Sequence, residues 1–357
     1  MIIKNIPTSP HPPAPFKGGI IHIQKRYNIL LCFSLAFLYA GSILFFSSYT
    51  HSSQDKTYQN PVVNYSLPDP TIIQATDGYF YLYATEDIRN TPIHRSRDLV
   101  NWENIGTAFT RETRPSFVER GSIWAPDINF INGRYVLYYS MSVWGGEWTC
   151  GIGVAVADKP EGPFTDKGPL FTSKEIDVQN SIDQFYIEEN GKKYLFWGSF
   201  HGIFGTELTD DGLAVKNKTV KWQVAGTAYE GVYIHKHDDY YYLFASTGSC
   251  CAGINSTYTT VVGRSKNLFG PYTDKSGNPM LDNHHEILIK KNERFVGTGH
   301  NSEIVSDAEG NDWIFYHAVD THNPRGRVLL IDQVLWKNGW PEVTGNTPSL
   351  SHKAPVF

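Results

Sequence analysis

An all-β fold, and within that class a five-bladed β-propeller, is the architecture that the sequence predicts. Aromatic residues make up 14% of the 357 residues, and 31 Gly stand against only 3 Met, a composition typical of strands and turns. No segment after Asp55 shows a convincing helical period in its apolar residues. A short strand, a Gly or Asp turn and an aromatic strand recur instead, at a spacing of roughly 50 to 70 residues.

The repeating unit has five copies along the chain. In order they are "PDPTIIQATDGYFYLYATED", "APDINFINGRYVLYYSMSVW", "SIDQFYIEENGKKYLFWGSF", "YEGVYIHKHDDYYYLFASTG" and "HNSEIVSDAEGNDWIFYHAV". Their predicted turns fall at Gly78, Gly133, Gly191, Asp239 and Gly310. Further strand-like runs follow each copy, which predicts about four strands per unit. A four-stranded sheet cannot bury both faces alone, whereas five sheets around one axis cover each other. A β-sandwich built from hairpin repeats is the alternative fold.

The N-terminal residues have a different composition. The apolar run "NILLCFSLAFLYAGSILFF", residues 28–46, follows Lys25 and Arg26 and is followed by polar residues. This order is typical of a secretory signal or an N-terminal membrane anchor, and it leaves cleavage open. We therefore expect a leader with a polar linker over residues 1–57 and a propeller domain over residues 58–357. The domain is expected to be exported to the periplasm, the cell surface or the medium.

Charge and cysteine content narrow the function further. The net charge is −5 and no basic block is present, which argues against a nucleic-acid partner. The 4 Cys are too few to provide a disulfide framework for an exported chain of this length. Cys250 and Cys251 are adjacent, and an oxidising compartment favours a disulfide between them that would rigidify their loop. Two unpaired thiols, or a bond to Cys150, are the alternatives.

Acidic residues recur in phase with the units. In a propeller the first strand of each blade faces the centre, so that the starts of these strands meet at one mouth. Four acids stand near those starts and a histidine–glutamate pair occupies the fifth position: Asp69, Asp127, Asp183, Glu230, then His300 and Glu303. Like charge and burial raise the pKa of some carboxyl groups while others stay ionised, which provides an acid and a base together. Glycoside cleavage needs that pair, whereas a carboxylate cage for a divalent cation is the alternative use.

The segments "SLPDPT", "GSIWAPDI", "NSIDQFYI", "TAYEGVYI" and "GTGHNSEI" resemble glycoside hydrolase family 43. The resemblance runs from about Tyr65 to near the C-terminus. It implies a five-bladed propeller and an inverting enzyme that acts on polysaccharides containing arabinose or xylose. No single segment is specific, but five of them in the right order at blade spacing are.

The resemblance also implies roles for individual residues. Asp69 would be the general base that activates water, and Glu230 the general acid that protonates the departing sugar oxygen. Asp183 would raise the pKa of the acid and orient it. Asp127 is expected to shape the site from outside this triad. The alternative for each of these acids is a capped or salt-bridged strand end. Candidate sugar contacts are Trp124, Asn180 and Ser181.

His300 has two interpretations. The resemblance implies that it faces the central channel and helps to hold a hydrated Ca²⁺ or another small cation. The alternative is a satisfied core histidine. No organic cofactor is expected.

The segment "GSCCAGINSTYTTVVGRS", followed by "VLLIDQVLWKNGWP", is most similar to the endo-1,5-α-L-arabinanases of the family. The expected partner is therefore arabinan or another pentose-containing polysaccharide. We expect a monomer that touches a membrane only through its N-terminal segment, if that segment is not cleaved. No accessory β-sandwich is expected after Phe357, unlike the two-domain β-xylosidases. An exo-acting α-L-arabinofuranosidase or β-xylosidase, and a non-catalytic sugar-binding propeller, are the alternatives.

Overall fold

The computed structural model describes residues 56–357. Strands dominate this segment, and its helices are three or four residues long. The all-β prediction is therefore confirmed. The predicted leader, including the apolar run at 28–46, lies outside the described residues. Within 56–357, no helix is both long and apolar enough to cross a membrane.

Three four-stranded sheets follow one another along the chain, and in each the strands are paired in sequence order. The first contains β2 (Thr71–Gln74), β3 (Phe80–Tyr83), β4 (Pro92–Ser96) and β5 (Glu103–Thr107). The second contains β6 (Ser122–Ile131), β7 (Arg134–Ser142), β8 (Gly151–Ala157) and β9 (Thr165–Thr172). The third contains β10 (Phe185–Glu189), β11 (Lys192–Trp197), β12 (Ile203–Glu207) and β13 (Trp222–Ala225).

The remaining strands form a nine-stranded sheet and a short two-stranded one. The nine-stranded sheet begins with β14 (Glu230–His237), β15 (Tyr240–Thr247), β16 (Thr259–Ser265) and β17 (Glu286–Ile289). It continues with β18 (Phe295–Gly299), β19 (Val305–Ser306), β20 (Asp312–Asp320), β21 (Val328–Lys337) and β22 (Trp340–Glu342). β1 (Thr57–Gln59) pairs with β23 (Ser351–Lys353). The helices are short: α1 (Ser173–Ile176), η1 (Gly253–Asn255), η2 (Met280–Asp282) and η3 (Thr344–Asn346).

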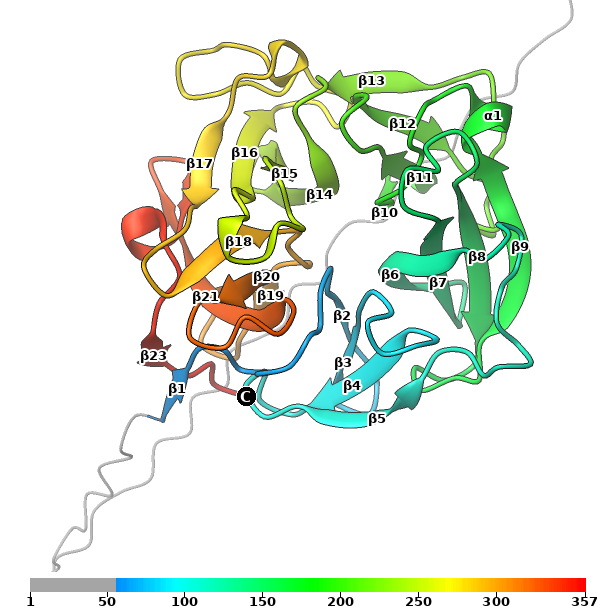
Figure 1. The fold of residues 1–357 in the computed structure, drawn as a ribbon. Coiled ribbons are helices and arrows are strands. Elements are labelled where there is room, and N and C mark those ends of the chain that lie inside the picture. The colour runs from blue at the N-terminus through cyan, green and yellow to red at the C-terminus, as the bar shows by residue number, and fades with distance from the viewer. Residues whose placement is uncertain (1–55) are drawn as a thin grey trace, which may run out of the picture. The chain divides into compact units, whose positions relative to one another are not determined.

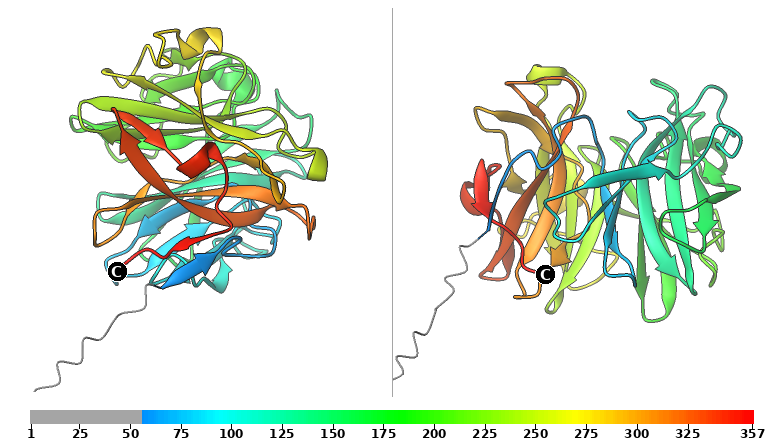
Figure 2. Two further views of the ribbon diagram at one scale, coloured as in Figure 1. Left: turned by 90° about the vertical axis from the view of Figure 1, so that its left-hand side faces the viewer. Right: turned by 90° about the horizontal axis from the view of Figure 1, so that it is seen from below.

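Figure 1 shows the sheets arranged around a common centre, with β2, β6, β10 and β14 nearest to it and β5, β9, β13 and β17 at the rim. The side views of Figure 2 show the strands of neighbouring sheets standing face to face. Each four-stranded sheet thus starts at the centre and ends at the periphery.

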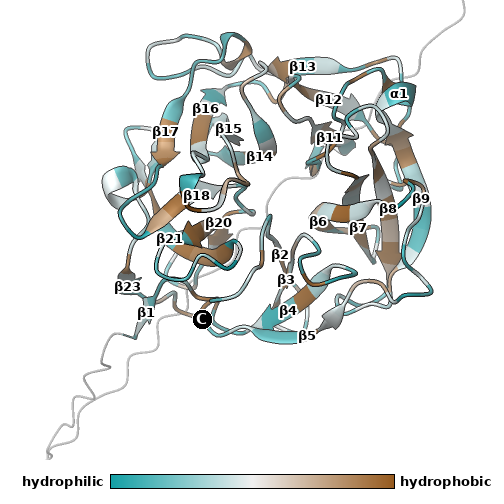
Figure 3. Ribbon diagram, in the orientation of Figure 1, coloured by the Kyte–Doolittle hydropathy of each residue, from teal (hydrophilic) through white to brown (hydrophobic). Residues whose placement is uncertain are grey.

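Four hydrophobic clusters fill the spaces between successive sheets. One joins the first and second sheets, for example Tyr83 with Leu137, and another joins the second and third through Tyr138 and Leu195. A third lies among the third sheet and the strands that follow it, and a fourth returns from the last strands to Leu82 of the first sheet. The apolar cores therefore run around the whole ring. Figure 3 shows the matching pattern, with hydrophobic residues on β8 and hydrophilic residues on rim strands such as β9.

The hairpins turn where their sequences predict. Asn132 and Gly133 connect β6 to β7 and both have positive φ, as do Asn190 and Gly191 between β10 and β11. Two residues of positive φ are the requirement of a type I′ turn, whose twist matches that of the strands it joins. These turns place the beginning of each central strand at the same end of the ring, where the acidic residues gather.

Candidate active site

One cleft of about 610 Å³ receives side chains from every part of the ring. Its lining includes Asp69, Asp183, Glu230 and His300, which come from four different units of the sequence. Four of the six residues that recur in phase along the chain therefore share one cavity.

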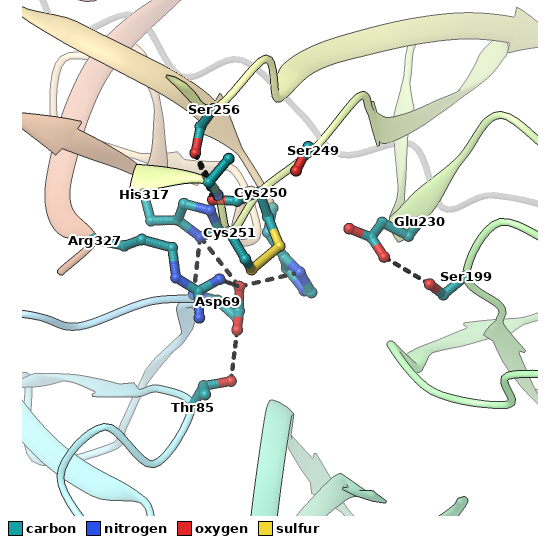
Figure 4. Close-up of a disulfide and its surroundings, with 12 residues drawn as sticks. Asp69, Thr85, Ser199, Glu230, Ser249, Cys250, Cys251, Ser256, His317 and Arg327 are labelled. Carbon is teal, nitrogen blue, oxygen red and sulfur yellow. Dashed lines mark hydrogen bonds and ion pairs between the residues drawn. A yellow bond between two sulfur atoms is a disulfide. The ribbon is translucent and has the colours of Figure 1, made fainter. Parts of the chain in front are cut away.

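Asp69 stands in the segment before β2 and is 7% exposed. Its Oδ1 lies 3.0 Å from the guanidinium of Arg327, 3.1 Å from Nδ1 of His317 and 3.4 Å from Nδ1 of His300. Its Oδ2 accepts a hydrogen bond of 2.6 Å from Thr85. Burial alone would raise the pKa of Asp69, but Arg327, His300 and His317 together hold that pKa well below its usual range. Asp69 is consequently an ionised carboxylate. Figure 4 shows its contacts with Arg327, His317 and Thr85.

Glu230 is the first residue of β14 and is 8% exposed. Ser199 donates a hydrogen bond of 2.6 Å to its Oε2, and Tyr258 forms a second one. Burial raises the pKa of Glu230 and the charge of Asp69 adds to this, while the two hydroxyl groups act in the opposite direction. The net result is a carboxyl group whose pKa lies above that of an ordinary glutamate.

Asp183 interacts electrostatically with both Asp69 and Glu230. Its Oδ2 accepts a hydrogen bond of 3.2 Å from the backbone N–H of Gly231, the residue after Glu230. Burial raises the pKa of Asp183 well above its usual range, and the charges of Glu230 and Asp69 raise it further. Because Asp183 and Glu230 repel each other when both are ionised, they favour a state with one proton and one charge.

Left-handed backbone brings these groups into the cleft. Asp69 has φ 53°, Asp183 has φ 60° and His300 has φ 47°, a region that residues other than Gly rarely occupy. Such positions cluster at functional sites because the surrounding structure must enforce them. The pairing of β14 with β15 also shifts register directly after Glu230, so that the strand start departs from regular geometry.

The predicted sugar contacts divide into two groups. Trp124 and Asn180 line the cleft. Ser181 is fully buried, donates to the carbonyl of Val178 and accepts from the indole of Trp197, so it does not reach the cavity. We therefore withdraw Ser181 as a sugar contact. Its side chain fixes the backbone behind the site instead.

Asp127 and Glu303 lie outside the cleft lining. Asp127 is buried and Glu303 is half-buried, and they interact with each other. Asp127 accepts a hydrogen bond of 2.7 Å from the N–H of Tyr186, and Glu303 accepts one of 2.7 Å from the N–H of Ile72. Burial raises the pKa of both groups, and their proximity couples them. The pair therefore links three central strands behind the site, which agrees with leaving Asp127 outside the triad.

His300 has surroundings that are compatible with a hydrated cation. Burial lowers the pKa of His300, so that its imidazole is neutral and able to coordinate a metal. The neighbouring Asn301 has a buried side-chain oxygen without a partner among the described residues. An imidazole nitrogen and an amide oxygen fit a cation whose other ligands are waters, but they do not form a carboxylate cage.

A different group has the spacing of metal ligands within 56–357: His235, His237 and Asp312. Asp312 already accepts hydrogen bonds from Ser306 and Trp336. The Nδ1 of His235 lies 2.9 Å from the hydroxyl of Tyr233. Two of the three members thus have protein partners, and we assign the cluster no site.

Sequence reasoning missed several residues of the site. Arg327 and His317 both contact Asp69 although they lie far along the chain, and Tyr258 supports Glu230. Two large aromatic side chains in the cleft were missed as well: Trp144 is 82% exposed and Phe200 is 37% exposed. One available signal was the aromatic-rich loop "SVWGGEW", since exposed aromatic rings suit the C–H faces of sugars.

Cys250 and Cys251 form a disulfide with each other, as one of the sequence-based alternatives predicts. Cys150 is a buried free thiol whose sulfur lies 3.1 Å from the hydroxyl of Ser173. A bond between Cys150 and the adjacent pair is therefore excluded in this structure. Both bonded cysteines line the cleft (Figure 4).

Comparison with known proteins gives a consistent picture. The sequence profile described as "Glycosyl hydrolases family 43" matches residues 58–341. The chain is 35% identical over 304 residues to the "Extracellular exo-alpha-(1->5)-L-arabinofuranosidase ArbA" of Cellvibrio japonicus, covering 77% of this chain and 85% of that protein. It is 33% identical over 334 residues to the "Extracellular endo-alpha-(1->5)-L-arabinanase 1" of Bacillus subtilis, covering 89% and 98%.

A solved structure shares this fold. It is described as "Structure of Cellvibrio cellulosa alpha-L-arabinanase complexed with Arabinohexaose", and it superposes with a TM-score of 0.71 at 34% identity. The match covers 78% of this chain and 95% of that one. Sequence and fold therefore lead to the same group of proteins.

Proposed function

The chain belongs to family 43 of the glycosyl hydrolases and is therefore an inverting glycoside hydrolase, and we propose that it cleaves polymers of α-1,5-linked L-arabinofuranose. The observation that carries the catalytic part of this proposal is the contrast between two buried carboxyl groups in one cleft. The pKa of Asp69 is held down by three neighbours, while the pKa of Glu230 is raised by burial. A base and an acid are then available at the same pH.

The proposed reaction uses each group once. Ionised Asp69 accepts a proton from the attacking water, and Glu230 donates its proton to the oxygen of the departing sugar. Asp183 is proposed to tune the pKa of Glu230, because the two buried carboxyl groups favour a state with one proton and one charge. Its hydrogen bond from the N–H of Gly231 also fixes it next to the acid. Trp124 and Asn180, with the exposed ring of Trp144, are proposed to contact the sugar chain.

We propose internal cleavage as the first candidate for the mode of action. The endo-acting relative from Bacillus subtilis matches over nearly its whole length, which supports this choice. Terminal attack is the second candidate because the relative from Cellvibrio japonicus is named as an exo-acting enzyme. A β-xylosidase has weaker support, because the chain is 28% identical to a xylan 1,3-β-xylosidase of a Vibrio species and covers only 60% of its length.

Product profiling on linear debranched arabinan tests the substrate and the mode together. A ladder of oligosaccharides with a rapid fall in viscosity is expected for internal cleavage, and arabinose alone would establish terminal attack. Hydrolysis of arabinoxylan or xylan without any attack on arabinan would overturn the proposed substrate. The anomeric configuration of the first product, followed by NMR, is an independent check on inversion.

The finer features of the architecture belong to the same proposal. We interpret the nine-stranded sheet as two blades, because a single parallel pairing between Thr259 and Thr298 joins β16 to β18. With the three four-stranded sheets this makes five blades. Export of the protein is supported by the extracellular relatives and by the disulfide in the cleft. A monomer remains the proposed state.

We also propose a channel cation, Ca²⁺ in the first instance, with His300 as one ligand and Asn301 as a candidate second. When bound, such an ion would supply positive charge beneath the sugar site. Dialysis against a chelator is expected to lower the thermal unfolding temperature, and added Ca²⁺ should restore it. An unchanged unfolding temperature, together with no heat of Ca²⁺ binding in calorimetry, would refute the ion.

A further inference from the structure

The loop that carries Cys250 and Cys251, residues 248–258, connects β15 to β16 and folds back on itself. The N–H of Ser249 donates to the hydroxyl of Thr257 over 3.0 Å. The hydroxyl of Ser256 accepts from the N–H of Ala252 over 3.1 Å and donates to the carbonyl of Cys250 over 3.0 Å. These bonds fix the loop through its own polar groups, without using the disulfide.

Packing beneath the loop fixes it a second time. Ser256 is 2% exposed and lies directly over Gly297 of β18, where a Cβ on the glycine would approach the Cβ of Ser256 to 2.6 Å. Tyr258, which closes the loop, is buried and hydrogen-bonds Glu230. The loop is therefore anchored both to the neighbouring strand and to the proposed acid.

The disulfide is expected to contribute little to the stability of the fold. A disulfide stabilises a protein mainly by closing a loop of the unfolded chain, and the effect grows with the length of that loop. Cys250 and Cys251 are consecutive, so their bond closes almost no chain. Ser256 already holds the loop in place, so we look for a role of the disulfide other than stabilising the fold.

The position of the sulfur atoms indicates that use. Cys250 is half-buried and Cys251 is exposed, and both line the cleft together with Asp69 and Glu230. In the view of Figure 4 the disulfide is drawn just above Asp69, and Glu230 is drawn to the right of both. Bonding the two sulfurs removes both thiol donors and leaves a rigid, polarizable, apolar surface that faces a cavity lined by charged groups.

We propose that the Cys250–Cys251 disulfide is a substrate-binding surface, whose sulfur and Cβ atoms pack against the C–H face of a furanose ring in the bound polysaccharide. This inference rests on the proposed function, since it needs a pentofuranose chain in the cleft. The ring in question contacts the disulfide while its neighbours in the chain reach Asp69 and Glu230. The disulfide thus contributes to substrate affinity and not to proton transfer.

The test compares the parent protein with the double variant Cys250→Ser/Cys251→Ser. Binding of linear α-1,5-arabino-oligosaccharides is measured by calorimetry in proteins that also carry Glu230→Gln, so that turnover is negligible during the titration. Kinetics are measured with Glu230 intact. The affinity is expected to fall about tenfold and KM to rise by a similar factor, the loss of one apolar contact, with kcat changed less than about twofold.

Three controls separate contact from structure. Cys150→Ser should bind and cleave like the parent, because that thiol is buried and does not itself line the cleft. A mild reductant should weaken binding by the parent and leave the double variant unchanged. The pH profile of kcat should be the same in both proteins, since the Tyr258–Glu230 contact does not depend on the sulfurs.

Two results would overturn the inference. Equal affinities of the parent and the double variant would show that the sulfurs do not touch the sugar. A fall in kcat with a shifted pH profile and an unchanged KM would show that the bond merely positions the loop. A parent protein that neither binds nor cleaves any arabinan would instead refute the proposed function, and the inference with it.

Discussion

The charge of Asp69 depends on three neighbours that come from the opposite end of the chain. Burial without partners would keep this carboxyl group protonated, because a charge is costly in a poorly solvated site. Arg327 offsets that cost at 3.0 Å, and His317 and His300 lie within 3.4 Å. Thr85 holds the other oxygen and in turn accepts from the N–H of Ala125. The proposed base is thus oriented both by Thr85, which follows β3 of the first sheet, and by Arg327, which precedes β21 of the nine-stranded sheet.

Removing the proposed acid should separate two classes of substrate. Glu230→Gln is expected to lower hydrolysis of natural arabinan by about two to four orders of magnitude, because the departing sugar oxygen needs a proton. Substrates with very good leaving groups should be largely spared. Asp69→Asn serves as the comparison and should be severe for both classes, since water activation is always required. Initial rates on arabinan and on a nitrophenyl arabinofuranoside provide the measurement, and equal losses for Glu230→Gln would contradict the assignment.

Removing the guanidinium should shift the pH dependence of activity. Arg327→Gln deletes a positive charge that lowers the pKa of Asp69, so that this pKa rises towards the value that burial favours. A base works only when ionised, so the acid limb of kcat/KM is expected to move to higher pH. Arg325→Gln, a nearby exposed arginine with no ion pair to Asp69, is the matched control and should leave the limb in place. An unmoved acid limb in Arg327→Gln would show that Asp69 is not the titrating base.

At the scale of elements, the loop over β18 depends on a glycine. Gly297 has φ 66°, and a Cβ there would approach Ser256 to 2.6 Å. Gly297→Ala should therefore cost the roughly 1–2 kcal/mol of a left-handed alanine plus the cost of displacing the loop. Gly310→Ala is the control, because Gly310 has φ 80° with nothing within 4 Å of its added Cβ. The measurement is the free energy of unfolding in denaturant, and equal losses in the two variants would refute the steric argument.

The hairpins and strands could be predicted from the sequence where neighbouring residues alone determine the local backbone conformation. The Asn-Gly pairs before β7 and β11 specify tight hairpins, and the aromatic alternation specifies strands that pack on both faces. The repeat then placed Asp69, Asp183 and Glu230 at one end of their strands, and these three share the cleft.

The remaining features of the site depend on pairings that no local pattern records. Arg327 reaches Asp69 across a separation of 258 residues, and nothing in its own segment marks that contact. Ser181 was misassigned because a local irregularity in the backbone turns its hydroxyl inward, to Val178 and Trp197. Periodicity gives the strand, but the direction of a side chain at an irregular strand end depends on tertiary contacts.

At the scale of the whole molecule, the two ends of the described segment, residues 56–357, are joined to each other. β1 pairs with β23, and Val63 forms a bridge to Leu329 of β21. The N–H of Leu67 then donates to the carbonyl of Arg327 over 2.8 Å. The segment that leads to Asp69 is therefore attached to the last sheet before it enters the first one. This closure of the ring brings Asp69 next to Arg327, whose positive charge stabilises the ionised carboxylate.

Asn60 is the side chain on which this closure depends, and its removal should destabilise the whole unit. It is 1% exposed, donates to the carbonyl of Ile331 over 2.9 Å and accepts from the N–H of Ile331 over 3.0 Å. It also donates to the carbonyl of Ser349 over 3.0 Å. Asn60→Ala leaves the N–H of Ile331 and the carbonyl of Ser349 without these bonds, while the carbonyl of Ile331 keeps the hydroxyl of Tyr58. We expect the free energy of unfolding to fall by about 2 to 4 kcal/mol. Asn101→Ala, on the surface, should change it by less than about 0.5 kcal/mol. Denaturant unfolding measures both, and a loss in Asn60→Ala no larger than in the control would show that the ring closes without this clasp.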